Sequence, residues 1–137
     1  MIVVTKKNIS IRFQEQDIIT KIMNKKITDD TGGLLDIKTS YKGDFYRDFA
    51  FTEEIGGVEV PMDLTYYDAA MVIQYHDNCK IIYLWDFGNS GLVYMGAGVI
   101  NVTQTLSLNR GTYEYFFTLT DANGLVVEYL RGKFIIE

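Results

Sequence analysis

The side chains best suited to chemistry in this chain are its one histidine, His76, and its one cysteine, Cys79, three positions apart. A thiol and an imidazole act as nucleophile and base when a third group orients the imidazole, and both are zinc ligands. The residues between them, Asp77 and Asn78, favour a turn between two strands. No orienting group and no further ligands stand at a suitable spacing, and a zinc site needs about four ligands. We therefore expect no metal, no cofactor, no catalytic residue and no enzyme activity.

Other stretches match short motifs of known catalytic or binding sites but lack the surrounding sequence that such sites need. Asp86-Phe87-Gly88 spells the metal-binding tripeptide of protein kinases, but the chain is too short for a kinase and lacks a glycine-rich loop. Gly32-Gly33 and Gly56-Gly57 lack the phosphate-loop pattern, because no helix follows either closely. Among 18 acidic residues nothing selects a pair for glycosidase chemistry. These stretches are interpreted as loops and turns.

Charge and hydropathy limit the class of partner. The 137 residues carry 13 basic and 18 acidic side chains, a net charge of −5, whereas nucleic-acid binding needs clustered lysine and arginine. No apolar run reaches the roughly 20 residues of a membrane span, and the N-terminal charges follow the apolar residues, the reverse of a secretory signal. We expect a chain that binds neither nucleic acid nor membrane and, with a single cysteine, resides in a reducing compartment.

The elements that position these residues are mostly β-strands. Short runs of alternating apolar and polar residues, separated by turns, predict seven or eight strands in a sandwich or barrel. Within them, Ile81, Tyr83 and Trp85 share one face of their strand, and Phe116 lies on the polar face of its own. Residues 53–57 and Asp121–Gly124 are predicted turns. The predicted strands cover residues 45–52, 68–76, 80–85, 92–95, 98–106, 112–120 and 125–136.

Residues 1–38 contain the only helix-like stretch of the sequence, and we treat them as an N-terminal arm ahead of a sandwich domain of residues 39–137. Ile2–Thr5 and Asn8–Phe13 are strand-like, and residues 14–26 predict one short helix, with acidic residues early and lysines late as the helix dipole favours. Its apolar stripe comprises Ile18, Ile19, Ile22 and Met23. Two interpretations stay open with equal weight: the arm docks on a partner or on symmetry mates, or residues 2–13 supply another sandwich strand.

Aromatic residues are abundant, with ten tyrosines, eight phenylalanines and one tryptophan. Most should lie in the core, because aromatic side chains suit half-buried pleated surfaces. Tyr46, Tyr66 and Tyr67 fall on wetter or less regular positions and are the candidates for a contact surface, since tyrosine is enriched at interfaces. Together with Trp85, the aromatic count also raises the alternative of a carbohydrate- or cell-surface-binding module.

Three segments, in order, resemble one family. KGDFYRDFAF (residues 42–51), PMDLTYYDAAMVIQ (61–74) and GTYEYFFTLTDANGLVVEYLRGKFII (111–136) are similar to the opening strand, the central strand and the closing hairpin of a phage domain. That domain is the immunoglobulin-like β-sandwich at the N-terminus of baseplate upper proteins of tailed bacteriophages, with related domains in other phage tail and head-fibre components. Tyr66 stands where the family often has glycine, and residues 1–38 have no counterpart.

The resemblance implies an antiparallel immunoglobulin-like β-sandwich, preceded here by the arm with its short helix. It implies a virion structural protein, an adaptor, anchor or decoration component that docks an appendage such as a head fibre, a tail fibre or a baseplate onto the particle. The expected partners are other virion proteins (capsid, tail or fibre subunits) and further copies of the chain, and the expected location is the virion, assembled in the host cytoplasm. A bacterial cell-surface or secretion-system domain is a third possibility and requires export.

Overall fold

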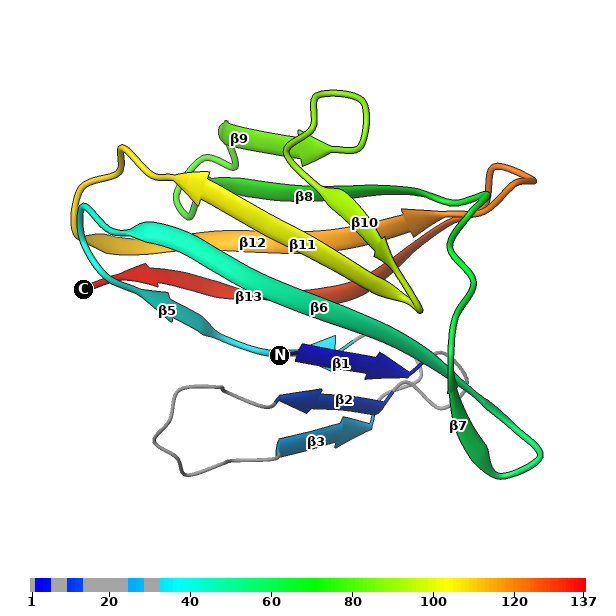
Figure 1. The fold of residues 1–137 in the computed structure, drawn as a ribbon. Coiled ribbons are helices and arrows are strands. Elements are labelled where there is room, and N and C mark those ends of the chain that lie inside the picture. The colour runs from blue at the N-terminus through cyan, green and yellow to red at the C-terminus, as the bar shows by residue number, and fades with distance from the viewer. Residues whose placement is uncertain (1, 6–9, 14–24, 29–32) are drawn as a thin grey trace.

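The computed structural model of the chain describes residues 2–5, 10–13, 25–28 and 33–137. These residues form two β-sheets packed face to face, with no helix in the described ranges. Figure 1 shows the long strand β6 (Asp44–Ile55) crossing over the β12–β13 hairpin of the other sheet. The fold is a mainly-β sandwich, as the sequence predicts.

The first sheet, here called sheet A, is built around β6. Its strands run in the order β10, β11, β6, β1, β2, β3, and β7 also pairs with β6. β1 lies parallel to β6, with Ile2 opposite Phe49, while β11 lies antiparallel on the other side of β6. Besides β6, the members of sheet A are β1 (Ile2–Thr5), β2 (Ser10–Phe13), β3 (Lys25–Thr28), β7 (Val58–Pro61), β10 (Val93–Gly96) and β11 (Val99–Thr105).

The second sheet, sheet B, is built around a long antiparallel hairpin. Its order is β4, β13, β12, β8, β9, and β5 also pairs with β13. Both β4 and β5 run parallel to β13, so each sheet of the expected antiparallel sandwich also contains parallel pairs. The members of sheet B are β4 (Gly33–Leu34), β5 (Ile37–Thr39), β8 (Asp68–Tyr75), β9 (Ile81–Asp86), β12 (Gly111–Thr120) and β13 (Val126–Ile136).

Aromatic rings join the two sheets. Phe49 and Phe51 of β6 lie 4.9 and 5.3 Å from the ring of Phe117 on β12. Phe45, also on β6, contacts Phe134 of β13 edge-on at 5.1 Å. All five rings are fully buried, so burial of aromatic area provides much of the free energy that holds the sheets together. The alternation that the sequence predicts for β6, β12 and β13 is confirmed by this core.

Two local predictions need correction. β6 continues through Ile55 into the region predicted as a turn, and only Gly56 and Gly57 reverse the chain before β7. Both glycines have positive φ, 60° and 81°, which lets two residues close a hairpin. The predicted helix of residues 14–26 lies mainly outside the described residues, and its last two residues, Lys25 and Lys26, belong to β3, which pairs with β2.

The N-terminal residues are joined to the sandwich. β1 pairs with β6, and Ile2 is 1% exposed within the core cluster. This pairing agrees with the interpretation in which residues 2–13 supply sandwich strands. The candidate docking residues Ile18, Ile19, Ile22 and Met23 lie outside the described residues.

Candidate interaction surface

A row of apolar side chains crosses the outer face of sheet B. Leu84 of β9 lies opposite Val72 of β8, and Val72 lies opposite Phe116 of β12. Directly opposed residues share a face of a sheet, and Val72 stands outside the core cluster that contains its chain neighbours Met71 and Ile73. We call Leu84, Val72 and Phe116 the apolar row. Leu84 is 45% exposed and Phe116 is half-buried, whereas Val72 is only 4% exposed.

A bulge adds one more apolar side chain to this face. The pairing of β8 with β9 shifts between Ile73 and Gln74, so that Ile81 lies opposite Gln74. Ile81 thereby leaves the face of Tyr83 and Trp85, where the alternation of the sequence places it, and is 53% exposed beside the apolar row. The prediction for Ile81 is wrong because a bulge inserts one residue and reverses the alternation beyond it.

A fixed guanidinium borders the apolar row on β13. Arg131 lies opposite Phe116, with its guanidinium carbon 5.5 Å from the centre of that ring. Glu128 accepts from Arg131 with both carboxylate oxygens, at 2.7 and 3.0 Å. This bidentate pair raises the pKa of Arg131 and holds its guanidinium against the ring.

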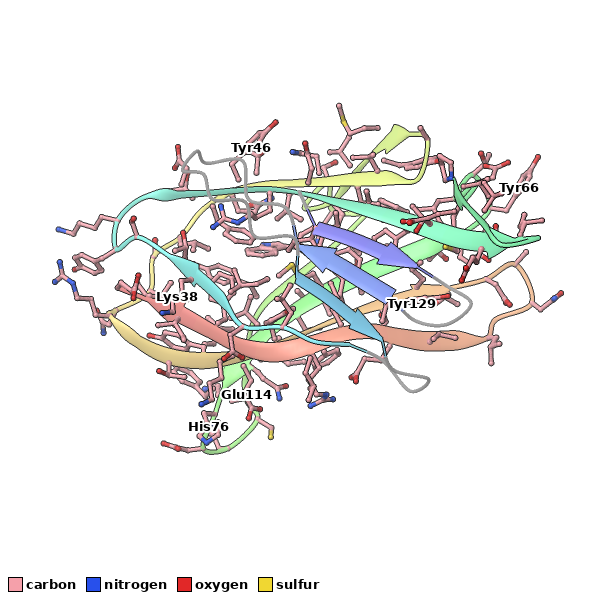
Figure 2. The ribbon with its side chains drawn as sticks, turned by 90° about the horizontal axis from the view of Figure 1, so that it is seen from below. Lys38, Tyr46, Tyr66, His76, Glu114 and Tyr129 are labelled. Carbon is pink, nitrogen blue, oxygen red and sulfur yellow. The ribbon has the colours of Figure 1, made fainter. Side chains whose placement is uncertain are left out.

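A hydrogen-bond network around the carboxylate of Glu114 lies on the same face, at the C-terminal end of β8. Glu114 of β12 accepts from the amide of Gln74 at 3.2 Å and lies 2.8 Å from Nδ1 of His76, and Figure 2 shows His76 and Glu114 side by side. The hydrogen bond from Gln74, followed by that from His76, lowers the pKa of Glu114. The sequence did not reveal this partner of the histidine, because Glu114 comes 38 residues later.

The environment of Cys79 is a tight turn. Its amide donates to the carbonyl of Tyr75 at 3.1 Å, its φ is 56°, and its thiol is exposed. The turn that the sequence predicts between His76 and Cys79 is thus present. In the described ranges, no group of three or more histidine, cysteine, aspartate or glutamate side chains is arranged to hold a metal ion.

The structure does not bring the tyrosines predicted as contact residues together. Tyr46 is 59% exposed on the outer face of sheet A, opposite Thr103, and Tyr66 is 79% exposed in the connection between β7 and β8. Figure 2 shows these two side chains well apart along the molecule. Tyr67 is half-buried and packs against the core.

Trp85 is part of the core. It is 5% exposed and stacks between Phe45, at 6.1 Å, and Tyr83, at 5.3 Å. A sugar-stacking platform needs an open aromatic face, which Trp85 does not offer in this conformation.

One signal in the sequence could have located the apolar row. Phe116 is the only large apolar residue on the polar face of its strand, between Glu114 and Thr118. Val72 and Leu84 gave no comparable signal, because apolar residues occupy both faces at these positions of their strands and only the cross-strand register shows which residues point outward.

Comparisons with known proteins leave the family open. No protein-family model matches the chain, and no curated protein matches it. Among solved structures, that of murine CRIg is similar over 74% of this chain and 92% of its own, with 13% sequence identity and a TM-score of 0.39. No helix in the described ranges has the length and apolar character needed to cross a membrane.

Proposed function

We propose that this chain is a structural protein of a tailed-bacteriophage virion. In this proposal it is an immunoglobulin-like adaptor, anchor or decoration domain that docks an appendage, such as a head fibre, a tail fibre or a baseplate, onto the particle. It acts by binding other proteins, with no catalytic step, and is assembled into the virion in the host cytoplasm. The identity of the particle rests on the sequence resemblance of residues 42–51, 61–74 and 111–136.

The observation that carries the docking role is the apolar row on the outer face of sheet B. Polar residues normally cover the water-facing side of an antiparallel sheet, whereas Leu84 and Ile81 leave apolar area exposed there beside Val72 and Phe116. A rim of charged groups, including Glu114 and Arg131, surrounds it. An apolar centre with a polar rim is the usual anatomy of a protein–protein contact.

The resemblance and the apolar row fall on the same strands. The second segment, residues 61–74, contains most of β8 and therefore Val72, and the third, residues 111–136, contains the β12–β13 hairpin with Phe116 and Arg131. The part of the chain that resembles the phage domain therefore supplies most of the proposed contact. Partners on this face are capsid, tail or fibre subunits or symmetry-related copies.

The first test is to find the chain in particles. Virions purified from the source culture by density gradient are analysed by mass spectrometry, and the copy number is measured against the major capsid protein. We expect co-purification, with hundreds of copies for a capsid decoration and about 6–60 for a tail, collar or fibre position. Absence from particles, with abundant protein in the cells, would contradict the proposal.

A matched pair of variants tests the face. Leu84→Glu places a charge on the apolar row, and Val93→Glu places the same charge on the outer face of sheet A at nearly equal exposure, 45% against 47%. We expect Leu84→Glu to lose incorporation into particles and Val93→Glu to keep it, while both stay folded, because exposed substitutions change stability by about 0.5 kcal/mol. Equal incorporation of the two variants would exclude the apolar row as the contact.

A further inference from the structure

The apolar row ends in an acidic hollow. The hollow has a volume of about 350 Å³ and lies where β8 begins and β9 ends. Asp68 lies opposite Thr120, and Ala70 lies opposite Asp86, so Ala70 is the next residue on the same face of β8 as Val72. The residues that line the hollow are Asp68, Ala69, Ala70, Asp86, Phe87, Gly88 and Thr120.

Small residues and a fixed loop shape the hollow. The amide of Asn89 donates to Oδ1 of Asp86 at 2.8 Å, and the amide of Asp86 donates to Oδ1 of Asn89 at 3.0 Å. The side-chain amide of Asn89 also donates to the carbonyl of Leu84 at 2.8 Å. Because these bonds tie the loop to the end of β9, the carboxylate of Asp86 is held in place before any partner binds.

Neither carboxylate of the hollow is paired with a cationic side chain of the described residues. Asp68 is exposed and Asp86 is half-buried, and the ion pairs found in the described part of the chain involve neither residue. Phe87, which packs partly against the core, adds an aromatic wall. Two aspartates, a threonine and a phenylalanine therefore line a single hollow at the end of an apolar surface.

We propose that this hollow binds an arginine side chain of the docking partner. A guanidinium is planar, offers five N–H donors that match carboxylates, and stacks on aromatic rings, whereas an ammonium is compact and strongly hydrated. Asp68 and Asp86 accept from the guanidinium, and Phe87 lies beside its plane. The inference deepens the proposed function, on which it rests, by naming the chemistry of the partner.

The spacing of the two sites specifies the partner segment. Ala70 and Val72 are two residues apart on one face of β8, which is about 7 Å along a strand. A partner chain that runs along β8 in an extended conformation therefore presents its arginine to the hollow and an apolar side chain, two residues away, to the apolar row. This pattern can be sought in candidate virion proteins.

The test uses the full chain and a defined probe. N-acetyl-arginine-methylamide is titrated into ¹⁵N-labelled protein, with the citrulline and lysine analogues as controls of equal or similar length. We expect the arginine probe to shift the backbone amides of residues 68–70, 86–88 and 120, the citrulline analogue to leave them unchanged, and the lysine analogue to bind more weakly.

Variants establish which carboxylates are responsible. The double variant Asp68→Asn, Asp86→Asn should lower the affinity for the arginine probe by about tenfold or more, since each charged hydrogen bond contributes about a factor of ten to the affinity. Asp77→Asn removes one negative charge from the turn after β8, as the single variant Asp68→Asn does from the hollow, and should leave the affinity unchanged. A dispersed spectrum of each variant confirms its fold, and the single variant Asp68→Asn replaces the double variant if the loop of Asp86 is lost.

Three results would overturn the inference. The first is an arginine probe that shifts no amide of the hollow, and the second is one that shifts them equally in the double variant. The third is a response to Ca²⁺ with none to arginine, which makes the hollow a cation site. If the wild-type chain incorporates into particles and the double variant does so equally, only this inference fails; if the wild-type chain is absent from particles, the proposed function fails whatever the probe shows.

Discussion

The outer faces of the two sheets differ in how their polar and apolar side chains are distributed. On sheet A, Asn101 donates to Asp48 at 2.8 Å and accepts from Thr103 at 2.7 Å, and Thr105 donates to Asp44 at 3.0 Å. On sheet B, the centre of the face is apolar and its polar groups lie at the edges. The two sheets bury their inner faces in one core, so the difference between their outer faces is not needed for folding. Tyr46 and Val93 are also exposed on sheet A, but each lies opposite a polar residue of β11. We therefore infer that the partner binds sheet B.

The largest expected effect is the difference in stability between truncating a core ring and truncating a ring on an outer face. Phe117→Ala removes the ring that contacts Phe49 and Phe51 of sheet A, and should lower the free energy of unfolding by about 3–5 kcal/mol. Phe116→Ala, one residue away on the outer face, should cost about 1 kcal/mol. Urea denaturation followed by the fluorescence of buried Trp85 measures both. Equal losses would mean that Phe116 belongs to the core and that the apolar row is structural.

The next effect concerns sheet B alone. The hydroxyl of Tyr115 donates to the carbonyl of Leu35 at 2.6 Å in a buried bond that ties the β4–β5 segment to the sheet. Tyr115→Phe leaves that carbonyl unpaired and should cost about 1–3 kcal/mol. Hydrogen exchange should rise in residues 33–39 and stay unchanged in β11 of sheet A. Tyr113→Phe, whose hydroxyl bonds the carbonyl of Asn109 in a part-buried position, is the control and should cost less.

A smaller effect tests whether the polar ladder of sheet A is only structural. Asn101→Ala removes the bonds to Asp48 and Thr103 and should cost about 0.5–1.5 kcal/mol. Incorporation into particles should be unchanged, the reverse of the result expected for Leu84→Glu. A stable Asn101→Ala protein that fails to incorporate would show that sheet A also meets a partner.

The smallest effect is the contribution of Glu114 to stability at acid pH. Hydrogen bonds from Gln74 and His76 hold the pKa of Glu114 below its ordinary value of 4.5. The stabilisation is therefore complete above about pH 4.5 and is lost as the pH falls through the lower pKa of the folded protein. The urea midpoint of Glu114→Gln should decline less than that of the wild type below that pH. Parallel declines would mean that the network adds no acid-sensitive stability.

The sequence predicts the parts of this sandwich that depend on local alternation. The β12–β13 hairpin and the inward face of β6 follow directly from residues such as Phe117, Phe134 and Phe49, because each strand has a distinct apolar face. Two of the tyrosines predicted to form a contact, Tyr46 and Tyr66, lie on different parts of the surface, so their role in a contact stays a prediction.

Long-range pairing sets the limit of such prediction. β4 and β5 are too short to show a period, and they pair with a strand that is distant in sequence. The outward turn of Ile81 depends on a bulge in the partner register, and the hollow depends on which strand ends meet. These features belong to the register between strands, which no single stretch of residues encodes.

The parallel pairing of β4 and β5 with β13 has a consequence for how the chain folds during synthesis. Asp36 accepts from the amide of Lys133, 97 residues later, and a side chain at Gly132 would collide with the carbonyl of Leu35. The segment of Leu35 and Ile37 can therefore reach its final position only after β13 has left the ribosome. Until then the growing chain carries two apolar residues with no place to pack, and closure of this loop should be among the last and slowest steps of folding.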